Sequence, residues 1–167
     1  MSCVVVMGVS GSGKSTIASL LADRLGWRVA DGDDFHPSRN IKKMTSGIPL
    51  ADTDRVEWLA AVRAWIDERA RNGTNAVISC SALTRNSRDV LRRPDVVFVF
   101  LMVSKEALVE RISGRCGHFM PLSLLESQLA TLEPPLPDEM GIHVDAHSTP
   151  GEIVDWLIPV ISDRFSL

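Results

Sequence analysis

The chain has 167 residues, of which 45% are hydrophobic and 23% charged, and its formal net charge is −3. This length and balance are typical of a single globular domain, which we expect to span residues 1–167. The net negative charge, without a basic and aromatic surface pattern, argues against nucleic acid as a partner. No apolar run is long enough to span a membrane, and an odd cysteine count of three, with no C-x-x-C pair, fits reduced thiols. We therefore expect a cytoplasmic protein with no membrane partner.

Apolar runs and helical periodicities alternate along the chain. Residues 3–7 form a short β-branched run that predicts a buried strand, and apolar residues at helical spacing over 14–25 predict the next helix. The same patterns predict strands over 28–30, 76–79, 96–103 and 142–144, and helices through 56–66, 89–91, 104–111 and 150–165. This alternation predicts an α/β domain in which a five-stranded parallel sheet carries helices on both faces.

A glycine-rich segment follows the first predicted strand. Residues 8–15 read Gly-Val-Ser-Gly-Ser-Gly-Lys-Ser and match the pattern G-x-x-x-x-G-K-[ST]. In this pattern backbone N–H groups hold phosphate oxygens, the lysine reaches the β- and γ-phosphates, and the final hydroxyl can bind Mg²⁺. Because a strand precedes it and an amphipathic helix follows, we interpret it as an ATP-binding phosphate loop. The predicted ATP-binding residues are Gly8, Ser10, Gly11, Ser12, Gly13, Lys14, Ser15 and Thr16, and Lys14 is also a predicted catalytic residue.

An acidic cluster follows the second predicted strand, where Asp31-Gly32-Asp33-Asp34 should lie at the carboxyl edge of the sheet. Transfer of a phosphoryl group to a hydroxyl needs an oxygen ligand for Mg²⁺ and a carboxylate near the acceptor proton. Asp31 and Asp33 could divide these two roles. A solvated, aspartate-rich turn is the alternative, but the position of the cluster in a phosphate-loop protein favours a functional role.

A second arginine- and glycine-rich segment lies in the C-terminal half of the chain. Arg111 and Arg115 flank Ser113-Gly114, and Gly117 follows shortly afterwards. Two glycines around a basic turn suggest a lid over about 113–131, with Arg115 as its catalytic cation. A helix end whose basic residues face the helix dipole is an equally acceptable interpretation.

With these features placed, the sequence resembles bacterial-type gluconate kinases over nearly its whole length. The phosphate loop alone indicates only a large superfamily. The stretch Ser127-Gln128 with Thr131-Leu132-Glu133 also carries the resemblance. More specific are the blocks between Asp31 and Leu59, among them Asp31-Gly32-Asp33-Asp34-Phe35-His36-Pro37 and Gly47-Ile48-Pro49-Leu50, and the blocks Cys80-Ser81-Ala82-Leu83 and Gly117-His118-Phe119-Met120-Pro121. The resemblance implies a P-loop kinase fold like that of nucleoside monophosphate and shikimate kinases. It also implies transfer of the ATP γ-phosphate to the 6-hydroxyl of D-gluconate, with Mg²⁺ as cofactor.

The resemblance further implies roles for individual residues. Asp31 would lie near Mg²⁺ together with Ser15, and Asp33 near the acceptor hydroxyl. Arg111 would lie on the adenine side, and Arg115 would act from the lid. A segment over about 35–73 would bind the acceptor, and the expected substrate-binding residues are Asp33, His36, Asn40, Lys43, Arg55 and Ser81. A homodimer is a further implication.

The chain departs from the family pattern at three positions. Thr84 and Ser87 stand where a basic residue and a tyrosine are usual, and His147 stands where an acidic residue is common. These changes put supporting contacts of the family pattern in doubt, but they do not affect the residues that would bind phosphate.

Two alternatives stay open. One is a P-loop kinase for another small hydroxy acid such as shikimate, although the segment over 35–59 argues against shikimate itself. The other is a regulatory P-loop ATPase that acts through a protein partner. Against it stand the absence of a guanine-binding N-K-x-D motif and the presence of an acceptor-binding segment.

Overall fold

The computed structural model describes residues 1–114 and 122–166 as a parallel β-sheet between layers of helices. The strands are β1 (Cys3–Met7), β2 (Arg28–Asp31), β3 (Ala76–Ser79), β4 (Val96–Met102) and β5 (Ile142–Asp145). They pair in the order β2-β3-β1-β4-β5, and every pairing is parallel. The helices of the described residues are α1 (Lys14–Leu25), α2 (Ser38–Thr45), α3 (Asp52–Arg71), α4 (Arg85–Leu91), α5 (Lys105–Ser113), α6 (Leu122–Thr131) and α7 (Pro150–Phe165), with short 3₁₀ helices η1 (Gly32–Phe35) and η2 (Pro137–Glu139).

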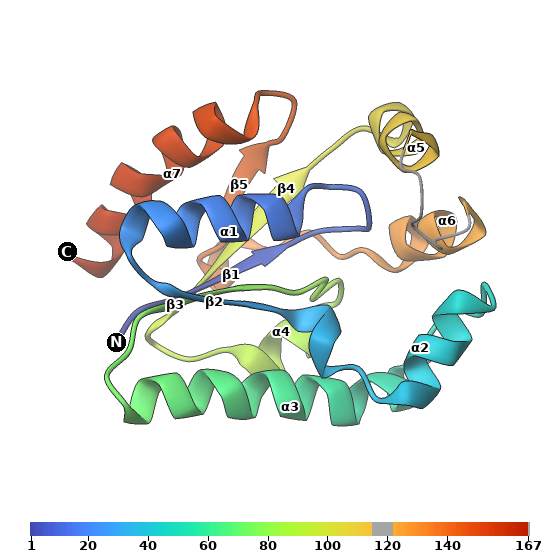
Figure 1. Cartoon of the computed structure of the whole chain (residues 1–167), viewed down its shortest axis with the longest axis horizontal. Coiled ribbons are helices and arrows are strands. Elements are labelled where there is room, and N and C mark those ends of the chain that lie inside the picture. Colours follow the sequence, from blue (N-terminus) through green and yellow to red (C-terminus); the bar gives the residue numbers. More distant parts are fainter. Residues whose placement is uncertain (115–121, 167) are drawn as a thin grey trace.

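Helices cover both faces of the sheet, as the alternation of patterns predicts. Figure 1 shows α1 and α7 on one face and α3 and α4 on the other. Successive residues of β1 point to opposite faces, so Val4 and Val6 pack with α1 and α7 while Val5 and Met7 pack against α3. Burial of both faces explains why this strand reads as a continuous apolar run rather than as an alternating one.

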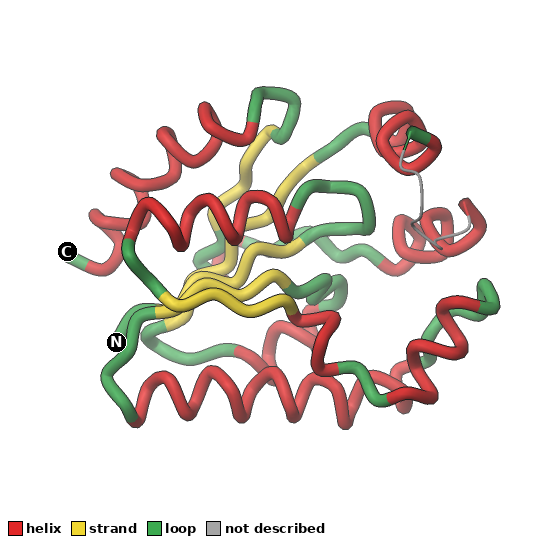
Figure 2. Tube along the Cα trace, viewed as in Figure 1, coloured by secondary structure: helices red, strands yellow, loops and turns green. Residues whose placement is uncertain are grey.

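The loops at the carboxyl ends of the strands meet at one edge of the domain. Figure 2 shows the loop between β1 and α1 at this edge, with α2, α5 and α6 arranged around it. In an open parallel sheet this edge is where ligands bind, because the strand order reverses there and the loops separate. The fold therefore brings the phosphate loop and the acidic cluster to the same place.

The main elements are confirmed, and two helices were not predicted. α2 lies within the expected acceptor segment, and α6 lies within the expected lid. The only fully buried side chain of α2 among those described is the polar Asn40, and its apolar residues Ile41 and Met44 are not fully buried, so a search for a buried apolar face does not find this helix. Residues 115–121, which include the predicted lid cation Arg115, lie outside the described residues. Across the described chain, no helix is long and apolar enough to cross a membrane.

Candidate active site

The phosphate loop connects β1 to α1, and its backbone conformation depends on glycine. Gly13, directly before α1, has a φ of +96°, a conformation that other residues rarely adopt. The Lys14 ammonium donates a hydrogen bond to the Val9 carbonyl oxygen at 2.9 Å, which folds the side chain back over the loop. The positively charged end of α1 and this lysine thus face the space where phosphate oxygens would bind.

The acidic cluster begins at Asp31, the last residue of β2, and continues into η1. A Cβ at Gly32 would lie 2.4 Å from the Ser79 carbonyl oxygen, so only glycine lets the chain pass this close to β3. The Asp31 carboxylate accepts hydrogen bonds from the Ser15 hydroxyl at 2.6 Å and from the Asp33 N–H at 3.0 Å. Burial alone would raise the pKa of Asp31, but these hydrogen bonds outweigh it and hold the pKa below its usual value.

Ser15 and Asp31 therefore meet beside the phosphate loop, although they are sixteen residues apart in the sequence. An ionised carboxylate and a hydroxyl are hard oxygen ligands of the type that Mg²⁺ takes together with phosphate oxygens and water. The donor set fits a magnesium ion carried on a nucleotide.

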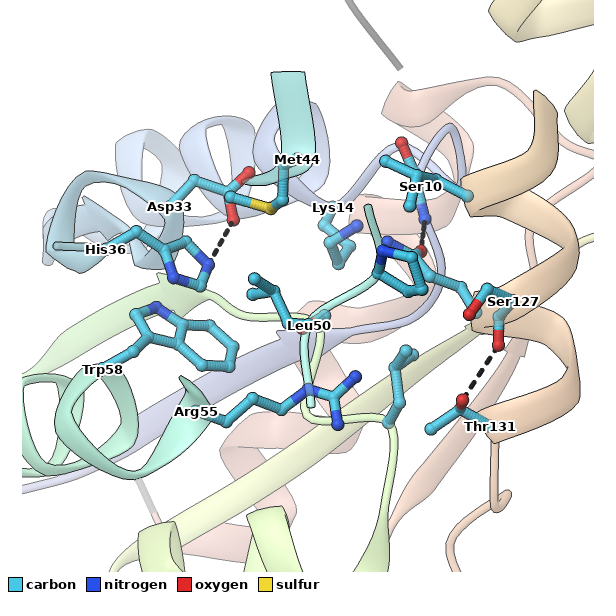
Figure 3. A pocket seen from close by; sticks show the side chains of 15 residues that line it. Ser10, Lys14, Asp33, His36, Met44, Leu50, Arg55, Trp58, Ser127 and Thr131 are labelled. Carbon is cyan, nitrogen blue, oxygen red and sulfur yellow. Dashed lines mark hydrogen bonds and ion pairs between the residues drawn. The ribbon is translucent and has the colours of Figure 1, made fainter. Parts of the chain in front are cut away.

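A cavity lies between the phosphate loop, η1, α3 and α6. Figure 3 shows Asp33 and His36 on one side of it and Ser127 and Thr131 on the other. Its lining consists of Ser10, Lys14, Asp33, His36, Met44, Pro49, Leu50, Arg55, Trp58, Ser81, Leu83, Leu124, Ser127, Gln128 and Thr131. Six residues with a predicted catalytic or binding role thus face one cavity: Ser10, Lys14, Asp33, His36, Arg55 and Ser81.

The two predicted substrate residues of α2 lie elsewhere. The Asn40 side chain is fully buried, and its amide nitrogen donates to the Asp54 carbonyl oxygen at 2.8 Å. The Lys43 ammonium lies 2.8 Å from both carboxylate oxygens of Asp54. Neither residue lines the cavity described above. Both attach α2 to the first turn of α3, so a direct contact of these two side chains with an acceptor stays an expectation of the family resemblance.

Arg55 presents a largely buried guanidinium to the cavity. Its side chain is 19% exposed, and Nη1 lies 2.9 Å from a carboxylate oxygen of Asp52, which is itself 90% exposed. An ion pair with so exposed a partner contributes little stability. Arg55 can therefore give up its contact with Asp52 and bind the carboxylate of a ligand at little cost in free energy. Arg55 is thus available to a carboxylate that enters the cavity.

A second hollow lies on the opposite side of the phosphate loop. It is lined by Gly11, Ser12, Gly13, Thr16, Ile17, Arg111, Ala146, Ser148, Pro150 and Ile153. The Arg111 guanidinium donates to the Ala146 carbonyl oxygen at 2.7 Å and to the Ser12 carbonyl oxygen at 3.4 Å. Arg111 therefore joins the phosphate loop to the loop after β5, at the border of a space suited to the rest of a nucleotide.

Sequence reasoning gave no role to Gln128 and Trp58. The Gln128 side-chain oxygen accepts a hydrogen bond from the Ser10 N–H at 2.7 Å, which joins α6 to the phosphate loop. The Trp58 indole donates to the Gly32 carbonyl oxygen at 2.7 Å and stacks on His36. Gln128 belongs to a block quoted for the resemblance, but only the tertiary structure brings it to the phosphate loop.

A buried ion pair supports the cavity wall that follows β3. Arg88 and Glu139 are joined by two hydrogen bonds of 2.6 and 3.0 Å, and both side chains are almost fully buried. Arg88 also donates to the carbonyl oxygens of Ala82 and Leu83. Because Ala82 has a left-handed φ of 42°, these bonds hold a strained turn in place beside the cavity.

The three departures from the family pattern have local structural partners. Thr84 is the N-cap of α4, where its hydroxyl accepts from the Ser87 N–H at 3.1 Å and lies 2.9 Å from the Ser87 hydroxyl. His147 is paired with Asp145 at the end of β5. None of the three lines the cavity between the phosphate loop and α6.

We expect Arg88→Met to lower the free energy of unfolding by about 2–3 kcal/mol, because it leaves the Glu139 carboxylate buried without its main partner. Arg92, 3.6 Å from that carboxylate, compensates only in part. Urea unfolding measures the effect. The double variant Arg88→Met/Glu139→Leu is the control, since replacing both ions should recover much of the loss. A single variant within about 0.5 kcal/mol of wild type would contradict this account of the pair.

Comparisons with known proteins agree with this arrangement. A model of the shikimate kinase family matches residues 10–158. A gluconokinase of Gluconobacter oxydans (strain 621H) is 48% identical over 157 residues, which cover 93% of this chain and 88% of that protein. A gluconokinase structure from Sinorhizobium meliloti 1021 has a TM-score of 0.86 at 45% identity and covers 97% of this chain and 92% of that chain. An unliganded sugar kinase structure from Janibacter sp. HTCC2649 has a TM-score of 0.91 at 49% identity and covers 95% and 93%.

The parallel sheet, the phosphate loop and the carboxylates at its edge define a P-loop kinase, a class that uses ATP. The shikimate kinase model describes this class broadly, whereas identities near one half over most of the chain are far more specific. The chain belongs to the gluconokinase family.

Proposed function

We propose that the protein transfers the γ-phosphate of ATP to the 6-hydroxyl of D-gluconate and so produces 6-phospho-D-gluconate and ADP. The observation that carries this proposal is that Lys14, Asp33 and Arg55 face one cavity from three different elements. A phosphate-binding cation, a carboxylate and a guanidinium are the groups that a phosphoryl donor and a hydroxy acid require. The names of the family members supply the identity of the acceptor.

Lys14 and Asp33 are the proposed catalytic residues that the structure describes. Lys14 would neutralise charge on the transferring phosphoryl group, a role that a fixed cation performs without reorganisation. The Asp33 side chain is 76% exposed at the cavity and would accept the proton of the attacking hydroxyl. Ser15 and Asp31 would hold Mg²⁺, which would supply positive charge to the phosphate groups of the nucleotide.

Arg55 would bind the carboxylate of the acceptor, because a guanidinium can donate to both carboxylate oxygens at once. His36 and Ser81 line the same cavity and would contact hydroxyl groups of the sugar acid. On the sequence and the resemblance alone, we also propose Arg115 as a cation that acts from a lid, a homodimer as the assembly, and the cytoplasm as the compartment.

A coupled ADP-release assay across gluconate, shikimate, other aldonates and simple sugars tests the proposed acceptor. We expect turnover with gluconate to exceed that with every other acceptor. Shikimate is the second candidate, favoured by the family model that matches residues 10–158. Turnover with shikimate but not with gluconate would replace the proposed function by this alternative.

We expect Arg55→Ala to raise KM for gluconate about ten- to a hundredfold, the scale of a charge-assisted hydrogen-bonded contact, and to leave KM for ATP nearly unchanged. Steady-state kinetics with each substrate varied in turn measures both constants. Arg71→Ala, which removes an exposed arginine at the far end of the same helix, is the matched control. A parallel rise in both KM values would show that Arg55 does not act on the acceptor alone.

A further inference from the structure

A buried amide, which does not itself line the cavity, lies next to one of the residues of the cavity wall. The side chain of Asn40, on α2, is completely buried. Its nitrogen Nδ2 lies 2.8 Å from the Asp54 carbonyl oxygen and 3.3 Å from Nδ1 of His36. Asn40 therefore connects a residue of the cavity wall to the first turn of α3.

These two contacts determine which nitrogen of His36 carries the proton. A backbone carbonyl oxygen can only accept, so the amide group that faces Asp54 must be the NH₂ group. This NH₂ group has two hydrogens and no free lone pair, so Nδ1 of His36 must be an acceptor as well. The proton of the neutral imidazole is then on Nε2.

Nε2 is the ring nitrogen that faces Asp33, at a distance of 3.9 Å from Oδ1 (Figure 3). The ring stacks on the Trp58 indole with centroids 4.3 Å apart and planes at 14°, and this contact fixes the plane of the ring. The charged groups around the ring are Asp33, from η1, and Arg55, from α3. Burial of the ring and the charge of Arg55 lower the pKa of His36 and outweigh Asp33, in agreement with a neutral ring.

We propose that Asn40 is a positioning residue that keeps His36 as a neutral Nε2–H tautomer. In this form His36 donates a hydrogen bond to a hydroxyl oxygen of the acceptor. It does not form an imidazolium ion pair with Asp33, so the Asp33 carboxylate stays available to accept the proton of the attacking hydroxyl. The hydrogen bond from His36 to the acceptor rests on the proposed function, whereas the assignment of the His36 tautomer is independent of it.

The tautomer can be read directly from the ¹⁵N chemical shifts of the His36 ring in long-range ¹H–¹⁵N spectra of the nucleotide-free protein. The chain has 4 histidines, and the spectrum of His36→Gln identifies the His36 signals. In wild type we expect a protonated Nε2 and an unprotonated Nδ1. In Asn40→Leu we expect a mixture of tautomers. In Asn40→Asp we expect protonation of Nδ1, because a carboxylate accepts where the amide donates.

Lys43→Met is the matched control. It removes the other contact between α2 and Asp54 but leaves the contacts of His36 intact. We expect the ring shifts of this variant to equal those of wild type. Asn40→Leu should also raise KM for gluconate about three- to tenfold, the worth of one hydrogen bond, without changing KM for ATP.

Three results would overturn the proposal: a wild-type ring protonated on Nδ1, an Asn40→Leu ring that keeps the wild-type shifts, or an equal shift in Lys43→Met. The last would mean that Asn40 only docks α2 on α3. If Asn40→Asp does not fold, Asn40→Leu decides by itself. If wild type does not phosphorylate gluconate, the proposed function fails, and the ring spectra still decide the tautomer.

Discussion

Lys14→Ala is expected to lower kcat by at least about a hundredfold, the scale of losing a charge that stabilises the transition state. The ammonium lies on the phosphate loop, 2.9 Å from the Val9 carbonyl oxygen, and faces the cavity. Its charge acts mainly on the phosphoryl group in the transition state, so its loss should appear in kcat and in kcat/KM alike. Single-turnover and steady-state assays with saturating ATP measure this loss.

The fold should survive the removal of Lys14, because Gly13 and the buried face of α1 determine the loop and the helix. A thermal unfolding curve that matches wild type is the control for this point. A folded variant with more than about a tenth of wild-type kcat would show that the loop is not the catalytic phosphate site.

Asp33→Asn is expected to lower kcat by about a hundredfold, the usual scale for loss of a general base, while the affinity for Mg-ATP stays near normal. The amide keeps the size of the side chain and the backbone N–H that donates to Asp31, but it removes the charge. Steady-state kinetics and nucleotide titration measure the two quantities separately. Asp34→Asn is the matched control, since Asp34 is the adjacent exposed carboxylate and does not line the cavity.

Asp31→Asn should behave differently, because the Asp31 carboxylate meets the Ser15 hydroxyl on the metal side. We expect a weaker response to Mg²⁺ that a higher metal concentration partly restores. If Asp33→Asn keeps its kcat and raises KM for gluconate, Asp33 binds the acceptor and is not a base. If it loses Mg-ATP binding instead, the two aspartates have exchanged roles.

The fold was largely predictable because its signals are local. β1 is a continuous apolar run, and α1 and α3 carry apolar residues at helical spacing. These patterns report burial directly, since a strand or helix must bury its apolar face against a neighbour. Two helices were not predicted. The only fully buried side chain of α2 among those described is that of an asparagine, and α6 lies within the predicted lid over about 113–131.

The sequence by itself determined the phosphate loop, because the pattern in residues 8–15 needs only neighbouring residues to form a phosphate cradle. It also placed Asp31 and Asp33 after a strand, which in a parallel sheet means the ligand-binding edge. These inferences required no knowledge of contacts between distant parts of the chain.

The tertiary structure alone decided which side chains meet. Ser10 and Gln128 are 118 residues apart in the sequence and are joined by one hydrogen bond. Arg88 forms an ion pair with Glu139, which is 51 residues away in the sequence. Asn40 was singled out for the acceptor, and only the tertiary structure shows its contacts with Asp54 and His36. Such contacts depend on how helices pack against one sheet, and packing is a property of the whole fold that spacing along the chain does not record.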